Sequence, residues 1–144
     1  MHNLIIEKIE TLCKKRGIKL TTQRRTVLDI MLTANKAMSA YDLLDLLKVS
    51  EPQAKPPTIY RALEFLLEQG FIHKVESSNS YIVCPHFQDP DHLSILFICD
   101  KCRQIFEKHS ANIEQQLKQL AQQSQFLIKH SVLEIHGVCQ SCQP

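Results

Sequence analysis

Four of the six cysteines in this 144-residue chain form two Cys-x-x-Cys pairs, Cys99 with Cys102 and Cys139 with Cys142. Each pair can present two thiolates from one tight turn, and four thiolates make a closed tetrahedral zinc site. A predicted strand, helix and strand between the pairs can bring their ends together. The pattern therefore predicts a structural zinc site, with two redox dithiols or two disulfides as the alternatives.

Four more potential ligands are dispersed along the chain: His73, Cys84, His92 and Glu107. His73 and Cys84 fall on opposite strands of a predicted hairpin, whereas His92 follows a polar connector and Glu107 ends a later predicted strand. One thiolate, two imidazoles and one carboxylate suit tetrahedral zinc, since an iron site would be richer in His and carboxylate oxygen. The four could clamp a metal ion between two domains. The alternative is a hairpin histidine, a buried cysteine and polar surface groups.

The segment from Thr58 to Leu63 opens a predicted helix. With Ile59 and Leu63 turned inward, Tyr60 and Arg61 face outward, where the first turns of a recognition helix reach base edges in the major groove. Arg can fork onto guanine, and a Tyr ring can touch a thymine methyl group. The alternative is an ordinary solvated helix face.

A second candidate contact with nucleic acid lies at an earlier predicted helix start. Thr21, Gln23 and Arg24 could hold phosphates there through side chains and backbone N–H groups. Residues 1–84 carry 12 Lys and Arg against 9 Asp and Glu, and residues 85–144 carry 5 against 6. This small imbalance favours an anionic partner for the first part of the chain.

Apolar periodicity and capping residues predict a winged helix-turn-helix over residues 1–84. Leu4 in the first helix is expected to face inward, and the third helix is expected to run through Leu43, Leu44, Leu46 and Leu47. The predicted elements are a helix capped by Asn3 and stopped by Gly17, a helix capped by Thr21 or Thr22, a helix capped by Ser39, a helix that follows Lys55 and stops at Gly70, and a hairpin of residues 71–76 and 81–84.

A polar connector at residues 85–91 marks the predicted domain boundary, and residues 92–144 form a second, α+β domain. Its expected elements are a strand over 93–99, a strand over 104–107, a helix over 112–123, a strand over 126–135 and the cysteine-bearing tail. A unit of this size has a thin core and usually needs a metal ion or a partner subunit. We therefore expect this domain to depend on one or the other.

Composition places the chain among ordinary globular proteins, with 44% apolar and 22% charged residues. The longest apolar run, at residues 93–99, is too short to span a bilayer, and the first residues do not resemble a signal peptide. We therefore expect a cytoplasmic protein without a membrane segment, in which cysteines serve metal binding rather than disulfides.

The chain resembles the ferric uptake regulator superfamily of bacterial metalloregulators, most closely its zinc uptake regulator branch. The resemblance covers nearly the whole chain, and the matching segments occur in the expected order. They are Leu20 to Arg24, Ser39 to Leu44, Lys55 to Leu63, Gly70 to Ser77 and Phe97 to Cys102.

The resemblance implies a homodimeric, zinc-activated repressor of zinc-uptake genes, with residues 92–144 as its dimerisation domain. The repressor would bind a double-stranded operator and two Zn²⁺ per chain. It assigns Tyr60 and Arg61 to base recognition. It also assigns the four Cys-x-x-Cys cysteines to a structural zinc site, and His73, Cys84, His92 and Glu107 to a regulatory one. Thr22 replaces the family's usual proline, and Pro85-His86-Phe87 replaces the histidine run of iron and peroxide sensors.

Three rival functions remain at this stage. An iron- or peroxide-sensing regulator belongs to the same superfamily. A zinc-ribbon interaction module would bind no DNA sequence selectively. An enzyme is disfavoured, because a zinc hydrolase needs an open ligand position and the dispersed set already offers four protein ligands. No small-molecule substrate is expected.

Overall fold

The computed structural model describes residues 2–89 and 92–144. The chain divides into two compact units, Met1–Gln88 and Asp89–Pro144. The division falls within the predicted connector at 85–91, of which residues 90 and 91 lie outside the described residues. No helix in the described ranges combines the length and apolarity that crossing a bilayer requires.

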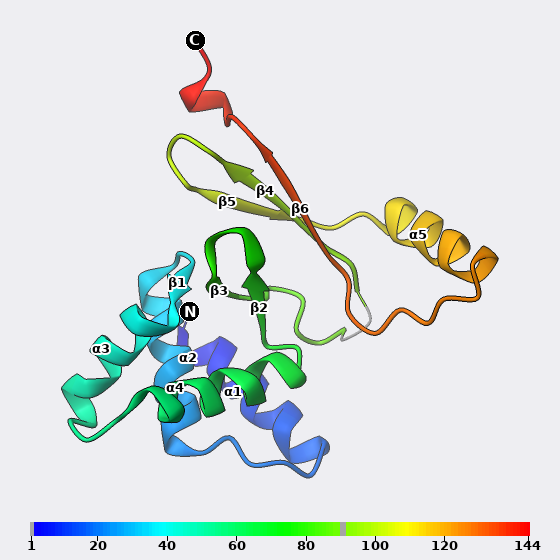
Figure 1. Ribbon diagram of the computed structural model, residues 1–144. Helices are drawn as coiled ribbons and strands as arrows, with labels where there is room; N and C mark the ends of the chain where they lie inside the picture. The colour runs from blue at the N-terminus through cyan, green and yellow to red at the C-terminus, as the bar shows by residue number, and fades with distance from the viewer. Residues whose placement is uncertain (1, 90–91) are drawn as a thin grey trace. The chain divides into compact units, whose positions relative to one another are not determined.

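The first unit is a helical bundle with a small three-stranded sheet, ordered β1-β3-β2 (Figure 1). The β2–β3 hairpin is the predicted wing, and Asn79 closes its turn at φ 49°. The elements of this unit are α1 (His2–Lys15), α2 (Thr22–Ala34), β1 (Met38–Ser39), α3 (Ala40–Ser50), α4 (Pro56–Glu68), β2 (Ile72–Val75), the 3₁₀ turn η1 (Glu76–Ser78) and β3 (Ser80–Val83).

Local capping signals set most helix ends in this unit. The Thr21 hydroxyl accepts a hydrogen bond from the Arg24 N–H at 3.3 Å, and Ser39 accepts one from Asp42 at 3.1 Å. Gly17 ends α1 with φ +69°, a backbone conformation that residues with a Cβ rarely adopt. These three predictions of helix ends are confirmed.

Two predictions in the first unit are wrong, the cap at Asn3 and the inward position of Leu4. Asn3 lies inside α1, which already includes His2, so Asn3 cannot be the cap. Leu4 is 54% exposed because the buried stripe of α1 includes Ile6, Ile9 and Cys13. Leu46 is 46% exposed because α3 buries the face that carries Leu43, Leu44 and Leu47.

The core of the first unit gathers the apolar faces of all four helices, with Phe71 and Phe87 in edge-to-face contact at 6.3 Å between ring centroids. Ile59, Leu63 and Leu66 of α4 are almost completely buried in it. The opposite face of α4 is thereby fixed toward solvent. Burial of Ile59, Leu63 and Leu66 therefore fixes the predicted recognition helix against the core.

The second unit is a three-stranded sheet with one helix (Figure 1). Strand β4 lies in the middle, antiparallel to β5 and parallel to β6. The elements are β4 (Ser94–Cys99), β5 (Ile105–Lys108), α5 (Ala111–Gln123), β6 (Val132–Gly137) and the 3₁₀ turn η2 (Gln140–Cys142).

The predicted last strand starts too early. Residues 126–131 are irregular, and β6 begins only at Val132. The register begins with Val132 opposite Ser94, the first residue of β4, and the Ser131 carbonyl before it accepts the Ser94 N–H at 3.1 Å. The length of β4 therefore determines where β6 can start.

Candidate functional site

The two Cys-x-x-Cys pairs meet in the second unit. We call Cys99, Cys102, Cys139 and Cys142 the four-cysteine cluster. Their sulfur atoms lie within 4.8 Å of one another. The parallel pairing of β4 with β6 ends with Cys99 opposite Gly137, so both strands deliver their cysteines to the same edge of the sheet.

Backbone hydrogen bonds prepare one of these thiols for metal binding. The N–H groups of Cys102 and Cys139 donate to the Cys99 sulfur at 3.5 and 3.4 Å and lower the pKa of Cys99 to about 6. Hydrogen bonding to the Cys139 thiol, together with burial, raises the pKa of Cys142 to about 12. The Cys99 thiolate therefore forms readily, whereas deprotonation of the Cys142 thiol is unfavourable.

A bound divalent cation would make deprotonation of these thiols favourable, because a coordinating thiol is deprotonated by the metal itself. Within the described residues, none of the four cysteines of the cluster is joined in a disulfide. Four sulfur donors so close together fit a tetrahedral zinc ion. The four-cysteine cluster is therefore suited to zinc.

His73 and Cys84 lie close together in the first unit. His73 is on β2 opposite Ile82, and Cys84 follows β3, where its N–H donates to the Phe71 carbonyl at 2.9 Å. The hairpin brings the Cys84 sulfur and a ring nitrogen of His73 within 4.8 Å. Cys84 is completely buried, so its sulfur faces away from bulk solvent.

The second unit holds the other predicted pair, His92 and Glu107, whose ligand atoms also lie within 4.8 Å. Glu107 sits on β5 opposite Leu96, and burial raises the pKa of its carboxyl group to about 7. A nearby cation would favour the charged form of this carboxyl group. Each unit therefore holds a pair of donor groups, and the two members of a pair lie close enough to share one cation.

The solvent face of α4 carries the predicted base-reading residues. Tyr60 is 43% exposed and Arg61 is also exposed, whereas Ile59 and Leu63 are buried. Thr58, in the first turn, accepts a hydrogen bond from the Lys55 N–H at 3.2 Å through its hydroxyl. This side-chain contact fixes the entry into α4.

A hollow of about 470 Å³ lies where α2 and α4 begin, and both Gln23 and Thr58 line it. The Gln23 amide donates to the Glu51 carboxylate at 3.2 Å. Within the described residues, the second Glu51 oxygen is buried and has no hydrogen-bond partner. Glu51 was not predicted from the sequence, because it lies 28 positions from Gln23 and belongs to no motif.

Arg24 makes contacts within the first unit that the sequence analysis did not anticipate. Its guanidinium lies 3.7 Å from the centroid of the Phe65 ring and donates to the Lys19 carbonyl at 2.9 Å. Thr21 uses its hydroxyl to cap α2. The structure thus gives both residues an internal role, and their predicted contact with phosphate stays a prediction.

A helix-turn-helix with a wing, joined in one chain to a thiol-rich α+β unit, defines a regulator that combines a nucleic-acid-binding fold with a metal site. The chain belongs to the ferric uptake regulator family, which it matches over residues 15–136. This family comprises regulators rather than enzymes.

Three relatives illustrate where the chain lies within the family. It is 50% identical to the zinc uptake regulation protein of Escherichia coli (strain K12), over 96% of this chain and 81% of that protein. It resembles the structure of a zinc uptake regulator complexed with zinc and DNA, with 48% identity and a TM-score of 0.91 over 99% of this chain and 95% of the other. It also resembles holo XcZur, with 35% identity and a TM-score of 0.87 over 99% and 98%.

Proposed function

We propose that this chain is a zinc-responsive DNA-binding repressor of zinc-uptake genes. The observation that carries the proposal is its similarity, over 99% of its length, to a zinc uptake regulator complexed with zinc and DNA. A repressor acts on the chromosome, so its place is the cytoplasm. Its partners are a second copy of the chain and a double-stranded operator.

Two zinc ions per chain have separate tasks in this proposal. The first is structural and is held by the four-cysteine cluster. The second is regulatory and takes His73 and Cys84 from the first unit, and His92 and Glu107 from the second. A thiolate, two imidazoles and a carboxylate favour zinc over iron at this second site.

Zinc controls DNA binding because its ligands come from both sides of the connector. Without zinc, the connector leaves the position of each recognition helix free. With zinc, the two units are fixed and the recognition helices of a dimer acquire one separation. The two half-sites of an operator lie at a fixed spacing, so a dimer binds both only when its recognition helices have the matching separation. Zinc and operator binding are therefore linked, and each strengthens the other by the same factor.

DNA recognition falls to α4 and the start of α2. Tyr60 and Arg61 read base edges from the exposed face of α4. Thr58, Thr21, Gln23 and Arg24 position the domain on the phosphate backbone, where helix N-termini favour anions.

The decisive experiment measures zinc content per chain and titrates operator DNA across a series of buffered free zinc concentrations. We expect two zinc ions, one of them readily removed by a chelator with loss of sequence-specific binding. Binding that follows iron instead would identify an iron or peroxide sensor. One zinc ion without selective DNA binding would identify an interaction module.

Ligand variants separate the two sites. His73→Ala and Cys84→Ser should leave a folded dimer that binds one zinc ion and no longer responds to added zinc. His130→Ala is the matched control, because His130 is exposed and outside both ligand sets. Loss of folding in the ligand variants would mean that these residues serve a structural site.

A further inference from the structure

Ser94 is a buried polar residue to which the proposed function gives no task. It is completely buried at the start of β4, and its hydroxyl lies 2.9 Å from Nε2 of His92. Ser94 lies two residues before Leu96, the register partner of Glu107, so both side chains face the same side of the sheet. The serine therefore contacts one proposed ligand of the second unit, His92, and shares a face of the sheet with the other, Glu107.

The contacts of the His92 ring define which nitrogen keeps its lone pair. Nδ1 is hydrogen-bonded to the carbonyl oxygen of Asp89, which can only accept. In a neutral imidazole only one nitrogen carries hydrogen, so Nδ1 is the donor and Nε2 carries the lone pair. Ser94 therefore donates its hydroxyl hydrogen to Nε2.

Zinc needs that same lone pair. We propose that the Ser94 hydroxyl competes with zinc for Nε2 of His92 and so raises the free zinc concentration at which the regulatory site fills. This inference rests on the proposed regulatory role of His92. When zinc binds, the Ser94 hydrogen bond to Nε2 breaks and the Nδ1 hydrogen bond to Asp89 is retained, which keeps the ring oriented.

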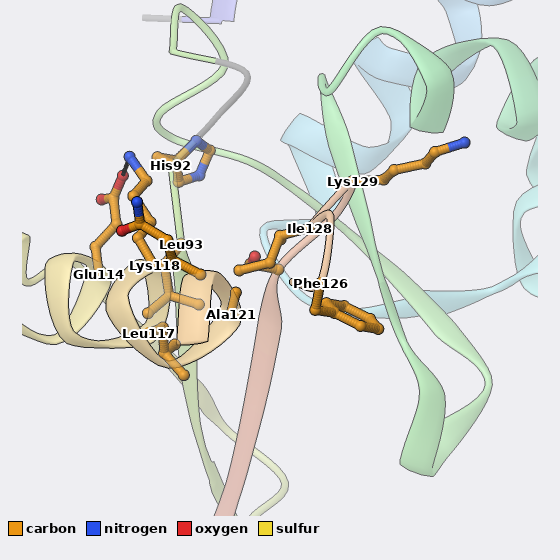
Figure 2. A pocket seen from close by; sticks show the side chains of 11 residues that line it. His92, Leu93, Glu114, Leu117, Lys118, Ala121, Phe126, Ile128 and Lys129 are labelled. Atoms are coloured by element: carbon orange, nitrogen blue, oxygen red, sulfur yellow. Dashed lines mark ion pairs between the residues drawn. The ribbon is translucent and has the colours of Figure 1, made fainter. Parts of the chain in front are cut away.

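Solvent can reach this region of the unit. His92 lines a hollow of about 420 Å³ together with Glu114 and Lys118 of α5. Figure 2 shows its ring beside the ion pair of these two residues, whose nitrogen and oxygen are 3.2 Å apart. His92 itself is only 6% exposed. Because the His92 ring is almost completely buried, its Nε2 is paired with the buried Ser94 hydroxyl before zinc binds.

Replacement of the serine tests the competition by the sign of its effect. Ser94→Ala should tighten binding of the second zinc ion by about 2- to 13-fold, the range that corresponds to the net contribution of one hydrogen bond. The measurement is a competition titration of zinc against a chromophoric chelator, with the four-cysteine cluster already filled. Structural damage would weaken zinc binding, so tightening has no such explanation.

Ser80→Ala is the matched control, because Ser80 is also buried and bonds to Ser78 rather than to a proposed ligand. It should leave zinc affinity unchanged. Unchanged or weaker zinc binding in Ser94→Ala would overturn the proposal. A wild-type chain that binds only one zinc ion would instead overturn the proposed function.

A second measurement needs no variant. Nitrogen-15 NMR of the wild-type protein, with only the four-cysteine cluster filled, should show His92 protonated at Nδ1 and unprotonated at Nε2. Addition of zinc should then shift the Nε2 resonance. The opposite tautomer would overturn the competition, because Ser94 would then accept a hydrogen bond from Nε2 and support a zinc ion bound through Nδ1.

Discussion

Charge balance in the four-cysteine cluster supports the proposed structural zinc ion. Two backbone N–H groups stabilise the Cys99 thiolate, while the Cys139 thiol raises the pKa of Cys142 to about 12. Zinc in small structural sites contributes about 10–16 kcal/mol. A unit of this size has a typical stability of only about 3–8 kcal/mol. We therefore expect the proposed zinc ion to decide whether the unit folds.

Cys102→Ser should remove one zinc ion per chain and abolish cooperative unfolding of the second unit, while the first unit stays folded. Metal analysis and thermal unfolding followed by circular dichroism measure the two effects. Cys13→Ala is the control, since Cys13 lies in the core of the first unit. It should keep the metal and lower stability by about 1 kcal/mol. A fully folded, zinc-loaded Cys102→Ser protein would contradict the assignment.

Arg61→Ala should weaken operator binding by about 1–3 kcal/mol per half-site and relax the preference for one base, because a forked contact to guanine is lost. Binding to random DNA should change much less. Fluorescence anisotropy with operator and random duplexes makes the comparison. Lys108→Ala removes the same charge from β5 of the second unit and should leave the operator preference intact. Equal losses on both duplexes would show that Arg61 contacts only phosphate.

Helix ends in the first unit follow from residues three or four positions apart, so the sequence predicts them well. Thr21, Ser39 and Gly17 each act on their own helix terminus. Thr21→Ala should lower stability by about 1 kcal/mol, equivalent to about 4–8 °C in melting temperature for a unit of this size. Thr22→Ala, at the first residue of α2, is the matched control. Equal shifts in the two variants would show that the Thr21 cap adds nothing.

Features that depend on distant partners were predicted less well. The two-residue strand β1 exists only because it pairs with β3, and no local pattern reveals it. The start of β6 depends on the length of β4, so residues 126–131, which open with the apolar Phe126, Leu127 and Ile128, were wrongly included.

The same contrast holds at the sites. The spacing of the Cys-x-x-Cys pairs is local and predicts the four-cysteine cluster directly. The set of His73, Cys84, His92 and Glu107 is dispersed, so its ligand types alone left a non-metal alternative open. The family resemblance was needed to favour a regulatory metal site. Glu51 and Ser94 remained hidden, because a lone carboxylate or hydroxyl gains meaning only from the hydrogen bond that the fold gives it.

At the scale of the whole molecule, the second unit leaves an apolar surface uncovered. Phe97, Phe106 and Ile135 occupy one row across the sheet and are each about 40% exposed. Within the described residues, α5 contains no buried side chain. An apolar surface of this kind is typical of a subunit interface. It agrees with the proposed homodimer.

Leu120 tests that interface, because it is 59% exposed on α5 and contributes little to the fold of a single chain. Leu120→Lys should leave each unit folded but weaken the dimer. Burial of one leucine contributes about 1.5–3 kcal/mol, and a symmetric dimer loses it twice. Sedimentation equilibrium should therefore show a dissociation constant raised by more than about 100-fold.

Operator binding should fall together with dimerisation in this variant, because a monomer engages one half-site and forfeits the gain from a second, linked contact. Gln119→Lys is the matched control, since Gln119 is an exposed polar neighbour on the same helix. It adds the same charge and should leave both dimerisation and DNA affinity near wild type. A Leu120→Lys protein that stays dimeric would place the subunit interface elsewhere. A monomeric variant with full operator affinity would refute the requirement that zinc fixes the separation of two recognition helices.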